Sequence, residues 1–397
     1  MALDDYKVAY DNSYEEVFNK VLVAKSIANM RFEPVLTYGG SVTRFNYDTS
    51  AVRVRTVSRG SASSIDAITD SNESLTINLE KEAVFYISDG EVTQTGPLNP
   101  GEVIGGQIAI KVATDLDARV LGEVLRAAYT FDTGDLTTSA STGVAFALDA
   151  TTTPQCVTRM PAKLKSNNQV LTNMAFVVDP YMVADLEQYL LGKQFDVVNS
   201  IWKNGYSGAI SMAEVYVSNN LTFTAVLTST TQHTTTETIT IGGVVITGRT
   251  GAVTTAGDYL IVTNEATSLA NLAGLINNPS VTSANQVAFS AADQATIADV
   301  LKMTAVTDGV HTVTITCVGA GRVTTAETMS DGSWGSRQVH AYYGKKGAID
   351  LVVQDNSPVD MRPTDDRRGT NIFSSYLAGL KTFADGAKKF LNVKIAV

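Results

Sequence analysis

The chain has 397 residues, of which 44% are hydrophobic and 18% are charged. This composition is typical of a globular protein with a sizeable core, and it excludes a chain that is disordered throughout. The 40 Asp and Glu residues exceed the 30 Lys and Arg residues, so the net charge is −10 at pH 7. Broad binding to nucleic acid is therefore not expected, although a local basic patch is compatible with this total.

Neither an export signal nor a membrane span is expected. The N-terminal stretch is acidic and lacks an apolar run, and no later stretch has about 18 consecutive apolar residues. Cys156 and Cys317 lie far apart and belong to no cluster of Cys and His residues. We therefore expect two free thiols and no structural zinc site.

The first third of the chain predicts an arm and a long hairpin. Residues 1–38 are polar, and Pro34 ends a helical pattern made by Tyr14, Val17, Phe18, Val21 and Leu22. Residues 40–95 alternate with a period of two, which predicts a β-hairpin with a polar tip at 58–74. A hairpin with so little apolar content cannot bury itself, so it should lie on another part of the chain or on another subunit. The hairpin carries charges of both signs: Arg53, Arg55 and Arg59 on one arm, and Asp66, Asp70 and Glu73 at the tip.

Residues 101–129 form the longest helix candidate. Apolar residues recur there every four positions, at Ile104, Ile108, Val112, Leu116, Val120 and Val124. This spacing predicts a long helix lying across a sheet. The following Thr- and Ser-rich residues 130–170 predict strands and turns. A buried strand at 175–178, a helix at 182–191 and a strand at 214–217 come next.

The composition changes at residue 222. Residues 222–333 contain 26 Thr and only 11 charged residues. They predict several strands and one helix at 268–277, capped by Ser or Thr. We interpret this segment as a self-contained β-rich domain whose ends lie close together. Residues 334–397 return to the earlier pattern, with strands at 337–343, 348–354 and 390–397.

Residues with catalytic potential are few and scattered. His233, His311 and His340 are the three histidines, and none shows the pattern of a nucleophile with its base. Several short motifs are incomplete or better explained as turns: Gly205–Gly208, Gly319–Arg322, and Asp365-Asp366 beside Arg367-Arg368. We therefore expect no enzymatic activity, no catalytic residue, no cofactor and no metal.

Several phrases occur in an order that resembles one known family: Phe176–Pro180, Glu214–Leu221, Gly344–Gln354 and Tyr376–Thr382. Together with the predicted arm, hairpin and long helix, they are similar to the major capsid protein of tailed bacteriophages with the Hong Kong 97-type fold. The resemblance covers about 1–221 and 334–397.

The resemblance implies an α+β fold with an inserted, mainly β domain. The implied parts follow the chain: an N-terminal arm at 1–38, an extended hairpin loop at 39–100, a spine helix with the peripheral domain at 101–174, a first axial part at 175–221, the insert at 222–333, and the rest of the axial domain with a return strand at 334–397.

The resemblance also implies a function in the virion. The chain would assemble as hexamers and pentamers into an icosahedral shell around double-stranded DNA, without sequence-specific binding. Its partners would be further copies of itself, a portal, a scaffold and decoration proteins, with assembly in the host cytoplasm. The six hairpin residues Arg53, Arg55, Arg59, Asp66, Asp70 and Glu73 would contact a neighbouring subunit. The Lys–Asn cross-link of some members is not carried over, because Lys81 is the only lysine between 40 and 95.

A second class of function is an adhesive or binding protein displayed on a surface. The Thr-rich β segment favours it, whereas the lack of an export signal speaks against it.

Overall fold

The computed structural model describes residues 23–32, 34, 40–48, 52–56, 59–60, 65–88, 100–138, 140–191, 209–210, 212–231, 233–330, 332–363 and 368–397. The helix predicted from Tyr14 to Leu22, the motif at 205–208 and the acidic pair at 365–366 lie outside these residues. The fold is a mixture of helices and several sheets. Residue contacts divide the chain into two units, of which the first includes Ile27–Val112 and Gly347–Lys388 and the second Ala113–Lys346 and Lys389–Val397.

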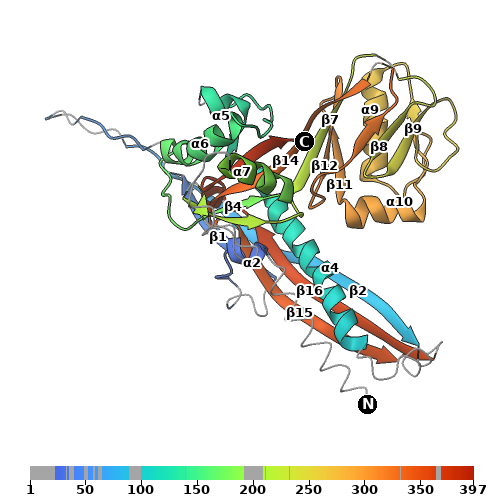
Figure 1. Ribbon diagram of the computed structural model, residues 1–397, viewed down its shortest axis with the longest axis horizontal. Helices are drawn as coiled ribbons and strands as arrows, with labels where there is room; N and C mark the ends of the chain where they lie inside the picture. The colour runs from blue at the N-terminus through green and yellow to red at the C-terminus, as the bar shows by residue number, and fades with distance from the viewer. Residues whose placement is uncertain are drawn as a thin grey trace. The chain divides into compact units, whose positions relative to one another are not determined.

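The first unit is built on a four-stranded antiparallel sheet of long strands in the order β1-β2-β16-β15 (Figure 1). A short helix, α11, precedes the end of this unit. The elements are β1 (Ser41–Asp48), β2 (Thr69–Ser88), β15 (Asp350–Pro363), β16 (Gly369–Lys381) and α11 (Ala384–Ala387).

The predicted hairpin exists, but its tip was misplaced. β1 pairs with β2 from Ser41 opposite Thr76 to Asp48 opposite Thr69. The turn-around therefore lies between residues 48 and 69, and Asp70 and Glu73 lie on a strand. The described residues 52–56 form no strand, although they alternate in sequence. The described ladder between β1 and β2 ends at Asp48 opposite Thr69, and the alternation alone did not predict that end.

The long helix α4 runs from Pro100 to Gly122 and continues as a 3-10 turn, η1 (Glu123–Arg126). Residues up to Val112 belong to the first unit and those from Ala113 to the second. The predicted apolar stripe is buried at Val112, Leu116, Val120 and Val124. The helix ends earlier than residue 129, because the chain turns there into a strand that pairs with the C-terminal strand.

The second unit contains a nine-stranded sheet and a four-stranded sheet. The path of the larger sheet is β11-β12-β7-β14-β4-β6-β5, with β17 beside β14 and β3 beside β17. Its strands are β3 (Tyr129–Phe131), β4 (Met174–Val178), β5 (Ala209–Ile210), β6 (Ala213–Val217), β7 (Thr222–Ser229), β11 (Met303–Thr307), β12 (Thr312–Cys317), β14 (Gly332–Lys345) and β17 (Phe390–Ala396).

The prediction of strands and turns for residues 130–170 was right for the end of β3 and for the non-helical residues 140–151, but it missed two helices. Three helices cover this part of the sheet and the segment after it: α5 (Thr133–Thr137), α6 (Thr152–Ser166) and α7 (Pro180–Leu191). In α6 the buried residues Cys156, Met160 and Leu164 recur every four positions and pack into the main apolar core with Phe131 and Phe176. This burial outweighs the Thr-rich composition and the internal Pro161.

The Thr-rich segment is not self-contained, because its strands β7, β11 and β12 belong to the larger sheet. Its ends do lie close together, as predicted. Thr222 in β7 lies opposite His340 in β14, and Ser229 lies opposite Gly332. The chain between β7 and β14 forms the smaller sheet, whose strands lie in the order β10-β9-β8-β13. Its strands and the nearby helices are β8 (Thr238–Ile241), β9 (Val244–Thr250), β10 (Asp258–Ile261), β13 (Thr325–Glu327), α9 (Glu265–Asn277), α10 (Ala291–Ala295) and the π-helical turn η2 (Thr296–Val300).

One detail of this segment, the start and cap of its helix, differs from the sequence prediction. The helix starts at Glu265, and its N-cap is Asn264, whose side chain accepts a hydrogen bond from the Thr267 N–H. The Gly319-Ala-Gly-Arg motif forms a turn, with Gly319 at φ +72° and Gly321 at φ +61°. A Cβ on Gly319 would overlap Ala118 of α4, so this glycine allows the chain to pass close to the helix.

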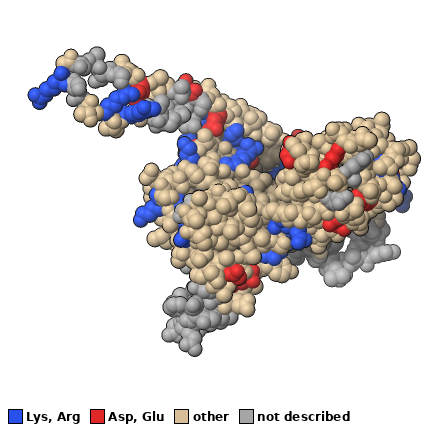
Figure 2. All heavy atoms as spheres, turned by 90° about the horizontal axis from the view of Figure 1, so that it is seen from above, with Lys and Arg blue, Asp and Glu red and all other residues tan. Residues whose placement is uncertain are grey.

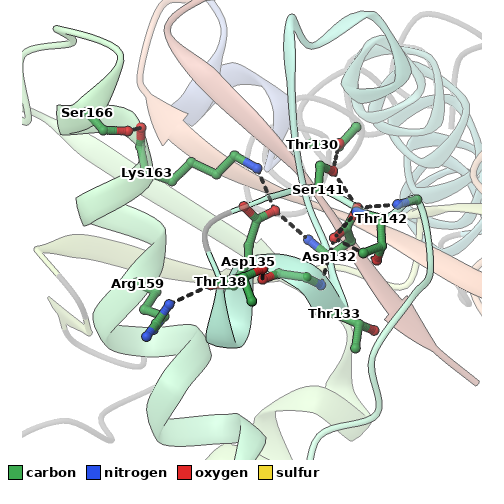
Figure 3. Close-up of polar contacts among 12 residues, drawn as sticks. Thr130, Asp132, Thr133, Asp135, Thr138, Ser141, Thr142, Arg159, Lys163 and Ser166 are labelled. Atoms are coloured by element: carbon green, nitrogen blue, oxygen red, sulfur yellow. Dashed lines mark hydrogen bonds and ion pairs between the residues drawn. The ribbon is translucent and has the colours of Figure 1, made fainter.

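A buried aspartate organises the loop beside α5 (Figure 3). Asp132 accepts hydrogen bonds from the backbone N–H of Gly134 at 3.0 Å, Thr142 at 3.0 Å and Gly143 at 2.7 Å, and from the Ser141 hydroxyl. Asp132 also forms a capping box with Asp135, which pairs in turn with Lys163 of α6. The carboxylate thus holds the loop at 140–143 against the start of α5.

A second buried aspartate, Asp117 of α4, accepts hydrogen bonds from the backbone at the start of the short helix α2 (Ala24–Ile27). Its oxygens accept the Ala24 N–H at 2.8 Å and the Val23 N–H at 3.2 Å. Burial raises the pKa of Asp117 from 3.8 to about 6, in spite of these hydrogen bonds and one from Asn220.

The raised pKa of Asp117 predicts that this residue favours folding at acidic pH. The folded chain binds a proton here below about pH 6, whereas the unfolded chain does so only near pH 3.8. Between these values the contribution of Asp117 to the free energy of unfolding should rise as pH falls, by up to about 1.4 kcal/mol per pH unit. Urea unfolding of the monomeric chain and of Asp117→Asn at several pH values checks this. A difference between the two that stays constant from pH 7 to pH 4 would contradict it.

Both cysteines are free, as predicted, and both are buried. Burial raises the pKa of Cys156 far above its usual range and that of Cys317 to about 12. Because the thiolate is the reactive form, neither residue should react with a thiol reagent in the folded chain. We expect no label at neutral pH after an hour and two labels per chain in denaturant, measured by intact mass. Labelling of the folded chain at the rate of the unfolded one would refute this.

Candidate subunit interface

One aspartate, Asp66, connects the two sides of the hairpin loop between β1 and β2. Asp66 accepts the backbone N–H of Arg53 at 2.9 Å and forms an ion pair with the Arg55 guanidinium at 2.5 Å. The two sides of the loop are thus tied together within the chain. A surface ion pair of this kind contributes little to stability, so its main effect is to fix the course of the loop.

The same loop exposes apolar side chains to an unusual degree. Val54 and Ile65 have relative exposures of 105% and 96%, and Ile68 and Val52 reach 57% and 50%. Phe45 on β1 is 61% exposed. Single exposed apolar residues are ordinary on protein surfaces, but a group of them along one hairpin is a candidate surface for contact with another protein.

Part of the sheet buries apolar side chains within the first unit, among them Leu351 on β15 and Tyr376 on β16. One cluster of the first unit has three buried members, Leu75, Val352 and Phe383, with Phe32, Val42 and Ile77 packed against it. Further along the 20-residue strand β2, Val84 is 48% exposed. Cover of this exposed part of the strand by another surface stays a prediction from the sequence.

Two contacts of charged side chains attach the base of the hairpin to the segment after β16, and neither was predicted from the sequence. The Arg44 guanidinium forms two hydrogen bonds of 2.8 Å with the Asp385 carboxylate and lies over the Phe383 ring. Glu73 accepts the backbone N–H of Ala384 at 3.0 Å. The alternating pattern around Arg44 predicted a strand, but nothing in the sequence indicated Asp385, 341 positions away, as its partner.

The six charged residues predicted to contact a neighbour are therefore not one group. Arg55 and Asp66 pair with each other, and Glu73 binds α11. Asp70 is exposed on β2, opposite Tyr47, while Arg53 and Arg59 are exposed in the loop. The exposed apolar residues are better candidates for the contact. The alternation of Val52 and Val54 with Arg53 and Arg55 was the signal that could have identified them.

The three histidines have separate surroundings. His340 is buried between Thr224 and Asn392, at 2.8 Å from each, and burial lowers its pKa to about 4. His233 is buried against Tyr259 at 2.7 Å, and His311 lies exposed at 3.2 Å from Glu265. These are packing and surface positions, as the sequence indicated.

Two kinds of feature are absent from the residues that the structure describes. No group of three or more His, Cys, Asp or Glu side chains is arranged to hold a metal ion. Among the helices described, none is both long and apolar enough to cross a membrane.

No family model and no curated protein matches the sequence. Among solved structures, the chain is similar to a protein of Mycobacterium phage Che8, with 15% identity, a TM-score of 0.44, and coverage of 94% of this chain and 90% of that one. It is similar to the capsid structure of the cyanophage P-SCSP1u, with 10% identity, a TM-score of 0.43, and coverage of 90% and 84%. The mature capsid of bacteriophage PhiM1 gives 10% identity, a TM-score of 0.42, and coverage of 90% and 82%. These solved structures with low TM-scores come from phages.

Proposed function

We propose that this chain is the major capsid protein of a tailed phage with the Hong Kong 97-type fold. Copies of it assemble as hexamers and pentamers into an icosahedral shell around double-stranded DNA. The phrases of sequence that resemble this family support the proposal, as does the order of the elements. That order is a hairpin, a 23-residue helix and a sheet with covering helices. Near the C-terminus, residues 347–388 belong again to the first unit and residues 389–397 to the second.

The observation that carries the proposal is the apolar hairpin. Val54 and Ile65 are almost fully exposed, and the loop that bears them is held in one course by Asp66. Covering one such side chain contributes about 1.5–3 kcal/mol. A shell repeats each contact in every subunit, so modest contacts sum to a stable particle.

The surface charge is compatible with a container for DNA that does not bind its contents tightly. On the face shown in Figure 2, Lys and Arg lie in small groups near Asp and Glu, and most of the surface is uncharged. A net charge of −10 does not favour broad phosphate binding. A strongly basic inner surface in an assembled particle would contradict this part of the proposal.

The remaining parts of the proposal follow from the family resemblance. The segment 222–333 acts as an inserted β-rich domain that either decorates the particle or stabilises contacts between subunits. Portal, scaffold and decoration proteins are the expected further partners. The protein functions in the virion and assembles in the host cytoplasm.

Negative-stain microscopy of the purified chain tests the proposal. We expect closed shells or rings of five and six subunits. A stable monomer at every concentration and salt condition tried would overturn it. Deletion of residues 222–333 tests the insert, because loss of shells supports a stabilising role and normal shells support decoration.

A further inference from the structure

The strand β11 ends the larger sheet, and one of its residues has both backbone groups occupied by a side chain. The Asn277 side chain donates to the Ala305 carbonyl at 2.7 Å and accepts from the Ala305 N–H at 2.9 Å. Both groups of Ala305 therefore point away from β12, its partner strand. In an antiparallel ladder this is the side on which the next strand would bind. The Asn277 amide thus occupies the position of a neighbouring strand's backbone.

The helix that carries Asn277 also donates a side-chain hydrogen bond to the edge strand of the smaller sheet. Asn271, six residues earlier in α9, donates to the carbonyl of Leu260 in β10 at 2.9 Å. The N–H of Leu260 donates to the Asn285 carbonyl at 2.8 Å. β10 also ends its sheet. The two backbone groups of Leu260 are thus bonded by one side chain and one backbone carbonyl. The two backbone groups of Ala305 are both bonded by the Asn277 side chain.

We infer that Asn277 closes the β11 edge against pairing with the β11 edge of a second copy of this chain. An uncovered edge strand is a template for another strand, and two identical antiparallel edges can pair through a two-fold axis. The sequence of β11, Met-Thr-Ala-Val-Thr, has no charge or proline to prevent this, and Val306 is 68% exposed. If the chain forms a shell as proposed, the high local concentration of copies increases the need for such a block.

The variant Asn277→Leu tests the inference, because leucine fills a similar volume and forms no hydrogen bond. We expect at least tenfold faster hydrogen exchange at the Ala305 amide in dilute protein. At higher concentration we expect association beyond the wild-type particle size, whatever that size is, together with renewed protection of β11. Normal exchange, or faster exchange without association, would overturn the inference, and so would association that leaves β11 unprotected.

Two further variants separate this effect from damage to the fold. Asn271→Leu removes a hydrogen bond from the same helix but leaves the Asn285 contact at β10, so it should not associate. Adding Thr304→Lys to Asn277→Leu should restore the wild-type particle size, because a lysine on an edge strand opposes pairing. A double variant that associates as much as Asn277→Leu would show that the association does not go through β11. Since the reference is the wild-type particle size, this outcome is independent of whether the chain forms shells.

Discussion

Replacing Val54 and Ile65 together by aspartate should prevent shell assembly while leaving the subunit folded. Both side chains are almost fully exposed in the single chain, so the substitutions remove no contact within it. In an assembled particle each would cover a neighbour, and the loss of both would weaken the contact by about 3–6 kcal/mol. That corresponds to roughly two to four orders of magnitude in the association constant. Sedimentation and negative-stain microscopy, with circular dichroism to verify folding, measure the outcome.

A matched control is available in the Thr-rich segment. Val281 and Val245 are also exposed, at 48% and 50%. The double variant Val245→Asp with Val281→Asp introduces the same charges elsewhere and should assemble normally. Equal yields of shells from the hairpin variant and the wild type would show that the hairpin is not a subunit contact.

The sequence predicted those elements whose apolar pattern is strong and local. β4 is buried throughout, and its run of apolar residues predicted it. The alternating patterns of β8 and β12 predicted both strands. For α4, the period of four predicted the buried positions, although not the point where the helix gives way to a strand.

The errors have a common physical origin, because they concern residues whose conformation depends on distant partners. Cys156, Met160 and Leu164 form the buried face of a helix, but the Thr-rich surroundings and Pro161 were given more weight than this spacing. The hairpin tip was misplaced because strand pairing, which the local pattern does not specify, ends at Asp48. The contact of the six charges with a neighbour stays a prediction, and the partners of Arg55 and Glu73 within the chain were not predicted.

The substitution Asp132→Ala should be among the most destabilising single changes in the second unit. It leaves the backbone N–H groups of Gly134, Thr142 and Gly143 without their acceptor in a buried place. Each unsatisfied buried donor costs about 1–3 kcal/mol, and partial access of water reduces the sum, so we expect a loss of about 3–5 kcal/mol. Urea unfolding of the monomeric chain measures it.

Asp149 provides the control, because it makes similar hydrogen bonds at the surface. It accepts the N–H groups of Thr151 and Thr152 at 2.7 Å each, and water can replace it. Asp149→Ala should therefore cost clearly less than Asp132→Ala, and equal losses would refute the role given to burial.

The pKa of Asp132 is lowered: burial alone would raise it, but the hydrogen bonds from Ser141 and the three backbone groups outweigh burial. Its contribution to stability is thus complete above about pH 4 and is lost as the pH falls through the lowered pKa. The stability difference between the wild type and Asp132→Ala should accordingly shrink in strong acid, which distinguishes loss of a carboxylate from mere loss of packing.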